Sequence, residues 1–319
     1  METPACNLCG DTRHRLVYRK PDDLFHLDEW FSVVECESCG LGYVSPRPRF
    51  ESMGRYYPSE FFAPFTRQRS HHTRRYRRES ELVEAHARRV PGKLLDLGCA
   101  GGDYPRFMRD RGWEVQGVEV SGGAEEVTDF PIHRCPFPEV PITTPAFDAV
   151  TAWAVLEHTH DPMAYFRKAA EVLLPGGVLV FVVPNFRSLA SRRLFCEDIP
   201  RHLFFFSEET IRRYVETSGL RLERAEQSDR IYSMAPSCWM RYVLVTQVLR
   251  REFRWEDAQG LWQRYSAALG APATPLNLLR FAATHPLSAL ERLTMPLCER
   301  YQLLTRRYGT LHFVARKPE

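Results

Sequence analysis

Residues 93–103, KLLDLGCAGGD, constrain the fold of this chain more than any other segment. The first four predict a short buried strand that ends on the carboxylate of Asp96, and a helical pattern follows the glycines. The small residues between strand and helix leave the backbone open to a ligand at a helix N-terminus. A strand, a glycine-rich turn and a helix in this order are typical of the nucleotide-binding corner of a doubly wound α/β sheet.

A second predicted strand, residues 114–119, ends on another carboxylate about 20 residues further on. Glu119 at its tip suits a ribose, because both ribose hydroxyls can donate hydrogen bonds to it. No lysine followed by serine or threonine comes after the glycines, so a phosphate-binding P-loop is disfavoured. These residues leave two ligands open, a dinucleotide and S-adenosylmethionine.

Several further blocks make the chain resemble the class I S-adenosylmethionine-dependent methyltransferases. The matching segments are residues 96–102, Glu119, residues 147–158 and residues 174–185. The resemblance covers about residues 90–227 and resumes at the last predicted strand, which begins at Thr310. It departs at Ala100, where the family more often has glycine. Alanine is small, so we expect no loss of cofactor binding there.

This resemblance implies an α/β fold with a doubly wound, Rossmann-like seven-stranded sheet, and it implies transfer of a methyl group. Asp96 would support the methionine end of the cofactor and Glu119 its ribose, while the adenine would rest on Phe137 or Cys135. The predicted cofactor contacts are Asp96, Gly98, Cys99, Ala100, Gly102, Glu119, Val120, Phe137, Ala152 and Trp153.

Two C-x2-C-G knuckles near the N-terminus predict a metal site. Cys6 and Cys9 form the first, and Cys36 and Cys39 form the second after 26 intervening residues. Four thiolates suit tetrahedral zinc and leave no open coordination position for chemistry. We therefore expect residues 1–45 to form a structural zinc-binding module. Four unrelated buried cysteines, or a redox pair, are less favoured, because paired knuckles rarely arise by chance.

Composition limits the cellular compartment and the classes of binding partner that we expect for this chain. A formal net charge of +3 over 319 residues gives no argument for nucleic acid, and no apolar run is long enough to cross a bilayer. The N-terminus has neither the basic leader nor the apolar run of a signal peptide. Five of the nine cysteines are scattered, so we expect a reducing cytoplasm.

Residues 46–92 are expected to form a linker and lid helices. Their aromatic residues, Tyr56 and Tyr57 among them, fit either a lid over a pocket or a cover for the edge of the core. The arginine-rich run from Arg67 to Arg78 fits either a nucleic-acid-facing patch or the solvated face of a helix. The second reading is favoured, because no ladder of aromatic side chains accompanies the arginines.

Two histidines are candidates for acceptor binding or proton removal. His158 follows the predicted strand 148–153, and His202 lies in the loop 184–207. Loops at the carboxyl edge of such a sheet line the ligand site. A histidine titrates near neutrality and so suits the role of a base, although a single histidine is more often structural.

The remaining segments complete the predicted domain organisation. Residues 93–227 would form the S-adenosylmethionine-binding core, residues 228–309 a helical insertion and residues 310–319 the last core strand. Apolar helical patterns interrupted by prolines predict that the insertion caps the pocket. A peripheral membrane contact or a dimer interface is the alternative, and the sequence leaves the oligomeric state open.

The leading functional prediction is methyl transfer to an O, N or C nucleophile of a small molecule. A sugar, a polysaccharide precursor or a natural-product intermediate would be the acceptor. The first alternative is an RNA methyltransferase that uses the knuckles and the arginine-rich helix as an RNA platform. The second is a nucleotide-binding module without catalysis. A dinucleotide dehydrogenase is disfavoured, because no partner domain or hydride-site pattern is apparent.

Overall fold

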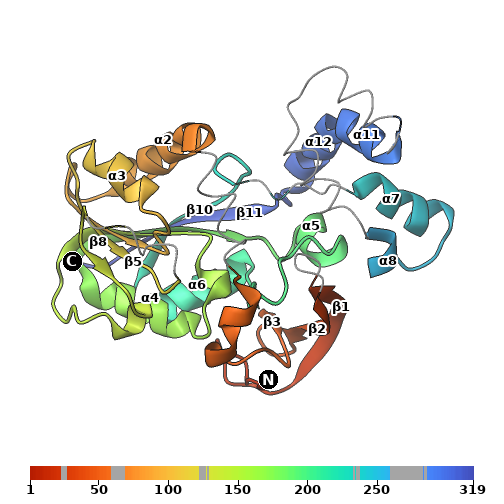
Figure 1. Ribbon diagram of the computed structural model, residues 1–319, viewed down its shortest axis with the longest axis horizontal. Helices are drawn as coiled ribbons and strands as arrows, with labels where there is room; N and C mark the ends of the chain where they lie inside the picture. Colours follow the sequence, from red (N-terminus) through yellow and green to blue (C-terminus); the bar gives the residue numbers. More distant parts are fainter. Residues whose placement is uncertain are drawn as a thin grey trace.

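The computed structural model describes residues 1–22, 27–58, 69–121, 127, 129–232, 234, 238–258, 283 and 286–319. Two β-sheets organise these residues, one of seven strands and one of four (Figure 1). Two segments singled out from the sequence lie outside the described residues. They are residues 59–68 of the predicted lid, with Arg67, and residues 259–282 of the predicted insertion.

The seven-stranded sheet confirms the predicted core. In sheet order its strands are β10 (Arg221–Gln227), β11 (Thr310–Arg316), β8 (Leu173–Pro184), β7 (Phe147–Trp153), β4 (Lys93–Leu97), β5 (Glu114–Val118) and β6 (Ile132–His133). The five strands from β8 to β6 run parallel, and β11 runs antiparallel to both of its neighbours. Every residue of β7 is buried, as continuous apolar strands in the middle of a parallel sheet should be.

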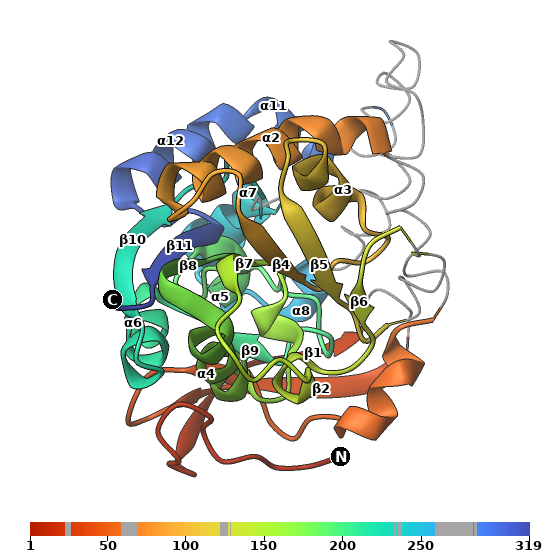
Figure 2. The same cartoon turned by 90° about the vertical axis from the view of Figure 1, so that its left-hand side faces the viewer.

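Helices cover both faces of this sheet. The helices α2 (Arg69–His86) and α3 (Asp103–Arg109) lie on one face, and α4 (Pro162–Val172) and α6 (Glu208–Thr217) lie on the other (Figure 2). Ser207 forms the N-cap of α6, since its side chain accepts a hydrogen bond from the backbone N–H of Thr210. The carboxyl ends of the parallel strands therefore open toward a single edge, where short elements gather.

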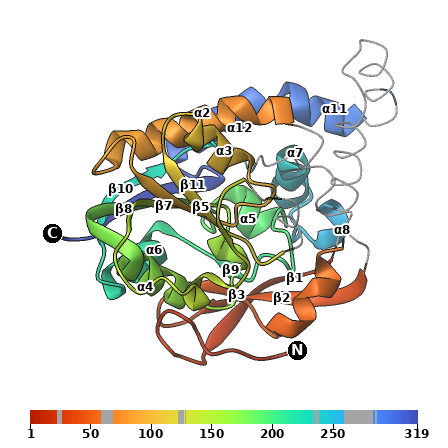
Figure 3. The ribbon, with the colours of Figure 1, turned by 60° about the vertical axis from the view of Figure 1, so that its left-hand side comes forward.

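The four-stranded sheet joins the N-terminal segment to the core. Its strands are β1 (His14–Asp22), β2 (Leu27–Cys36), β3 (Gly42–Val44) and β9 (Phe204–Phe205), all antiparallel to their neighbours. The strand β9 comes from the core loop that carries His202, and Phe205 pairs with Gly42. A side chain at Gly42 would meet the ring of Phe186 at 2.7 Å, so the sheet packs closely on the core. Figure 3 shows this sheet below the large one.

The remaining helical elements complete the described chain. They are η1 (Phe50–Tyr56), η3 (Phe137–Glu139), η4 (Leu156–His158), α5 (Leu189–Arg193), α7 (Trp239–Val243), the π-helix η5 (Leu244–Val248), α8 (Trp255–Ala258), α11 (Pro286–Leu293) and α12 (Met295–Thr305). Among the described residues, none of the helices has both the length and the apolar character that crossing a bilayer requires.

A hydrophobic cluster forms where the N-terminal sheet, the loop that carries His202 and the insertion meet. It combines Tyr18 and Phe31 of the N-terminal sheet with Phe195 of the His202 loop and with Val245 and Phe253 of the insertion. Figure 1 shows the N-terminal sheet, α5, α7 and α8 at the same end of the large sheet. Three stretches far apart in the sequence thus share one core beside the carboxyl edge.

Candidate active site

The turn after β4 has the backbone conformation that its glycines suggest. Gly98, Ala100 and Gly102 have φ values of +64°, +45° and +78°, all in the left-handed region. A Cβ at Gly98 would lie 2.7 Å from Val155, and one at Gly102 would lie 2.8 Å from Phe130. Glycine is therefore required at both positions by conformation and by packing against neighbouring side chains.

Glu119 lies directly beside this turn. Its Oε2 accepts a hydrogen bond from the backbone N–H of Ala100 at 2.9 Å, and its Oε1 accepts one from Ser121 at 2.8 Å. The residue is 9% exposed, and each carboxylate oxygen has a further lone pair for a ligand hydroxyl. The two sequence features predicted to bind the cofactor are therefore neighbours in space.

Asp96 is buried at the end of β4. Thr151 on the adjacent strand donates a hydrogen bond of 2.6 Å to Asp96 Oδ1. Burial, with the charge of Glu119 adding to it, raises the pKa of Asp96 to about 7, although the Thr151 hydrogen bond opposes this. A cationic ligand beside this carboxyl group would favour its charged form.

The other predicted cofactor residues differ widely in exposure. Val120 is exposed, Ala152 and Trp153 are buried at the end of β7, and Cys99 is buried with its sulfur against Gly117. Phe137 is fully buried against Tyr165, with the ring centroids 5.7 Å apart.

Of the two residues proposed from the sequence for the adenine, the half-buried Cys135 is thus the more accessible.

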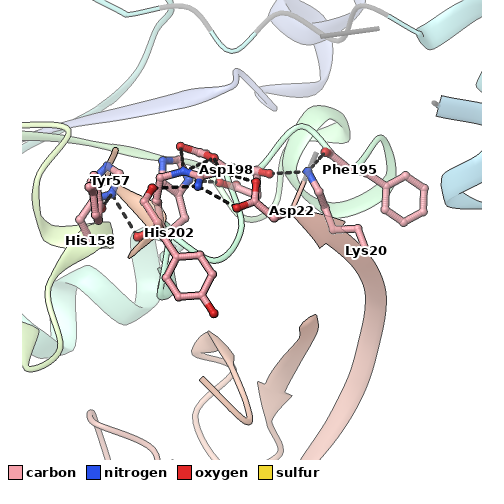
Figure 4. Close-up of polar contacts among 10 residues, drawn as sticks. Lys20, Asp22, Tyr57, His158, Phe195, Asp198 and His202 are labelled. Carbon is pink, nitrogen blue, oxygen red and sulfur yellow. Dashed lines mark hydrogen bonds and ion pairs between the residues drawn. The ribbon is translucent and has the colours of Figure 1, made fainter. Parts of the chain in front are cut away.

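The two predicted histidines come together. The rings of His158 on η4 and His202 lie edge to face with centroids 4.7 Å apart (Figure 4). His158 Nδ1 lies 3.0 Å from the hydroxyl of Tyr57 and 3.1 Å from the carbonyl oxygen of Arg201. Burial, with the neighbouring His202 adding to it, lowers the pKa of His158 to about 3, so His158 is neutral at pH 7.

His202 has a buried acidic partner that sequence reasoning did not select. Its Nδ1 lies 2.6 Å from Oε2 of Glu197, a residue with no exposed surface. Burial opposes protonation of His202, but the hydrogen bond and the charge of Glu197 outweigh it and raise the pKa of His202. An acid that fixes Nδ1 leaves Nε2 as the reactive nitrogen of such an imidazole.

Glu157 completes this group. It is 1% exposed, and neither of its carboxylate oxygens has a hydrogen-bond partner among the described residues. Burial raises its pKa to about 7, with the charge of His202 opposing the shift. Glu157, His158 and His202 bring ligand atoms within 4.8 Å of one another, so they could also hold a cation. In the sequence, the position of Glu157 directly before His158 is the feature that indicates Glu157 as a site residue.

The four knuckle cysteines also converge. The sulfur atoms of Cys6 and Cys39 are 3.4 Å apart, those of Cys9 and Cys36 are 3.6 Å apart, and all four lie within 4.8 Å of one another. A Zn–S distance of about 2.3 Å places the sulfur atoms of a tetrahedral site about 3.8 Å apart. Gly10 follows the first pair with a φ of +75° and donates its N–H to the Cys6 carbonyl. The cluster fits a tetrahedral metal.

This sheet order, with an antiparallel strand inside a parallel sheet and an acid beside a glycine-containing turn, defines the class I methyltransferase fold. The family model of a methyltransferase domain matches residues 68–225. The chain is an S-adenosylmethionine-dependent methyltransferase.

Curated relatives and solved structures are similar to parts of this chain, among them the following three. The ubiquinone biosynthesis O-methyltransferase of Chromobacterium violaceum is 27% identical over 192 residues, which cover 52% of this chain and 83% of the relative. The enzyme of the same name from Alkalilimnicola ehrlichii is 33% identical over 106 residues, 29% of this chain and 42% of the relative. This chain thus spans most of the first relative and less than half of the second.

The solved structure is the 1,6-didemethyltoxoflavin-N1-methyltransferase of Burkholderia thailandensis. It is 14% identical, with 92% of this chain and 98% of that chain covered and a TM-score of 0.48.

Proposed function

We propose that this enzyme methylates a hydroxyl group of a small-molecule acceptor and that His202 is the general base. The observation that carries the proposal is the buried pair of His202 and Glu197, 2.6 Å apart at the carboxyl edge of the sheet. A hydroxyl must lose its proton as it attacks a methyl group, so a base of this kind serves an oxygen nucleophile better than a neutral amine.

For methyl transfer the protein mainly has to align the two reactants, exclude water and remove one proton. Bound S-adenosylmethionine supplies a methyl group already activated on a sulfonium. In our proposal Nδ1–H of His202 donates to Glu197, and Nε2 accepts the proton from the acceptor hydroxyl. The charge of Glu197 then stabilises the imidazolium. His158, which is neutral and packed against His202, contacts the acceptor and fixes the ring of the base.

For the cofactor we propose the contacts predicted from the sequence. Glu119 would hold the ribose, and its position 2.9 Å from the N–H of Ala100 supports this. Asp96 would face the methionine end, where a cationic group would favour its ionised form. Gly98, Cys99, Ala100, Gly102 and Val120, together with Phe137, Ala152 and Trp153, would shape the rest of the site.

A small molecule is the proposed acceptor class. The curated relatives are named for O-methylation in ubiquinone biosynthesis, which supports a small hydroxylated acceptor. A sugar, a polysaccharide precursor and a natural-product intermediate remain within this class.

The arginines of α2 give the RNA alternative little support. Arg75 forms an ion pair with the buried Glu79, and Arg78 donates to the carbonyl of Arg230, so part of the predicted patch serves packing.

We also propose that the four knuckle thiolates hold a structural zinc ion, which the spacing of their sulfur atoms supports. The insertion 228–309 is proposed to close the acceptor side. Stacking of Phe253 on Phe195 of the His202 loop, with centroids 6.1 Å apart, supports this role.

Product formation tests the proposal directly. Purified enzyme with S-adenosylmethionine would be offered a catechol acid such as 3,4-dihydroxybenzoate, a nucleotide sugar and total tRNA. Mass spectrometry would then locate the new methyl group. We expect a methylated small molecule and lowering of the rate by about 100-fold or more in His202→Gln. His160→Gln is the matched control, because His160 contacts the Pro48 carbonyl instead of the pair. Methylated tRNA, or full activity in His202→Gln, would contradict the proposal.

A further inference from the structure

A lysine of the N-terminal sheet is buried against the loop that carries His202. Lys20, on β1, has no exposed surface, and its Nζ donates to the carbonyl oxygens of Phe195 at 3.0 Å and Glu197 at 2.7 Å (Figure 4). Burial of an ammonium group is costly unless acceptors surround it. These acceptors belong to the main chain of the loop that carries His202, and they lie 175 and 177 residues from Lys20 in the sequence.

A second buried contact from the same strand fixes the other end of this loop. The Arg201 guanidinium makes two hydrogen bonds to Asp22, at 2.8 and 3.0 Å, and it also binds Asp198 of its own loop. Asp22 and Arg201 are both essentially unexposed. Two side chains of β1 therefore hold this loop: Lys20 binds the carbonyl oxygens of Phe195 and Glu197, and Asp22 binds Arg201, the residue immediately before His202.

The loop would not hold this shape by itself. Phe195 has a φ of +57°, a conformation that is unfavourable for a residue with a side chain. Its ring packs against Tyr18 of β1, with centroids 5.1 Å apart, and against Phe253 and Trp255 of the insertion. The Lys20 ammonium lies 5.1 Å from the Trp255 ring centroid, so one cation contacts sheet, loop and insertion.

We propose that Lys20 and Asp22 are positioning residues, through which the N-terminal sheet fixes the place of Glu197 and the His202 imidazole. The inference rests on the proposed function, in which His202 is the base. It assigns to the cysteine-bearing module a role in the acceptor site and none in nucleic-acid binding. It also explains why a loop at the active site has buried charged anchors where solvent-facing residues are usual.

The test measures His202 itself and requires no acceptor. The pKa of the His202 imidazole would be followed by NMR in protein labelled with ¹⁵N-histidine, with the signal assigned by His202→Gln. The titratable and charged groups that face His202 are Glu157 and His158 of η4 and Glu197, Asp198 and Arg201 of its own loop. In Lys20→Met we expect the pKa of His202 to fall by about one unit. The Glu197 carboxylate would no longer be held at hydrogen-bond distance from Nδ1 of His202, while the imidazole would remain buried.

Three comparisons make this result specific. Arg19→Met, an exposed neighbour on β1, should leave the pKa of His202 unchanged, and Lys20→Arg should restore most of it. Calorimetry with S-adenosylhomocysteine should give the same affinity in Lys20→Met as in the wild type, within about twofold. A folded Lys20→Met protein with an unchanged pKa of His202 would overturn the inference, and so would a parallel loss of cofactor affinity.

A second variant covers the case in which Lys20→Met does not fold. Asp22→Asn keeps an oxygen for Arg201 and removes only the charge, and we expect the pKa of His202 to move in this variant too, with retained cofactor affinity. No movement in folded Asp22→Asn would overturn the inference. The proposed function fails separately, through full methyl transfer by His202→Gln.

Discussion

At the scale of single residues, the candidate site depends on carboxyl groups whose surroundings differ. Glu119 has backbone N–H donors on both oxygens, whereas Glu157 has no hydrogen-bond partner among the described residues. The pKa of Glu157 is raised by burial, and Glu197 is paired with His202. The same functional group can thus bind a diol, hold a proton or orient a base, depending on its neighbours.

Replacing Glu119 tests the proposed ribose contact. Glu119→Ala should weaken binding of S-adenosylhomocysteine by about 1–3 kcal/mol, because the ribose hydroxyls would lose their acceptor in a buried site. Isothermal titration calorimetry measures the change. Glu114→Ala, at the exposed start of β5, the strand that ends just before Glu119, should bind the ligand as the wild type does. Equal affinities for the wild type and Glu119→Ala would remove the ribose assignment.

Ala100 allows a test of backbone strain. Because Ala100 has a φ of +45°, Ala100→Gly should raise the free energy of unfolding by about 0.5–1 kcal/mol, despite the greater freedom of glycine in the unfolded chain. Urea denaturation measures this change. Ala170→Gly, within the helix α4, should change stability by a similar amount in the opposite direction. Destabilisation by both substitutions would show that the turn is unstrained.

Glu157 should make stability depend on pH. Its pKa is 4.5 as a free group and about 7 in the folded protein, because burial penalises the charge. Between these values the folded state binds more protons, so the contribution of Glu157 to stability falls as the pH rises through this window.

The free energy of unfolding of Glu157→Gln, relative to that of the wild type, should therefore increase by about 2–3 kcal/mol as the pH is raised from 4 to 8. Urea denaturation at both pH values measures this gain. The exposed Glu51→Gln should show no such trend, and a constant difference for Glu157→Gln would argue against a buried neutral carboxyl.

At the scale of elements, the N-terminal sheet cannot be separated cleanly from the core. Cys6 and Cys36 lie in the same hydrophobic cluster as Leu95 and Tyr214 of the core, and the Tyr214 hydroxyl donates to the side chain of Asn7. The strand β9 closes the sheet from the core side. The cysteine knuckles therefore connect the first strands with α6.

Loss of one thiolate should release the metal. Purified wild-type protein should contain about one zinc per chain, and Cys6→Ser should contain well under one and melt at a lower temperature. Elemental analysis and thermal denaturation measure the two effects. Cys298→Ser, a buried cysteine outside the knuckles, should retain the metal. Metal-free wild-type protein of full stability would refute the zinc site.

At the scale of the whole molecule, three distant stretches of chain meet in one hydrophobic cluster beside the carboxyl edge, on the side where we propose that the acceptor binds. Removing the metal should loosen these stretches and leave the cofactor side intact. Hydrogen exchange after treatment with a chelator should accelerate in β3 and β9 and in the segment 195–203. It should stay slow in β4 and β5, which are buried within the parallel sheet. Uniform acceleration over the chain would show that the two sides unfold together.

The sequence alone determined the features that arise from local chemistry. The turn after Asp96 and the acid at Glu119 are each specified by residues a short distance apart, and the seven-stranded core was implied by the family resemblance that the motifs carry. The knuckle spacing likewise predicted four converging cysteines, because glycines at fixed offsets permit only a few turns.

Only the tertiary structure decided which partners these residues have. Glu197, Lys20 and Asp22 carry no local signal, since a charged residue in a strand or loop is usually solvated. Their burial against His202, Phe195 and Arg201 arises when β1 meets a loop more than 170 residues away. Long-range packing removes water from these charges, and the loss of water is what obliges them to pair with one another.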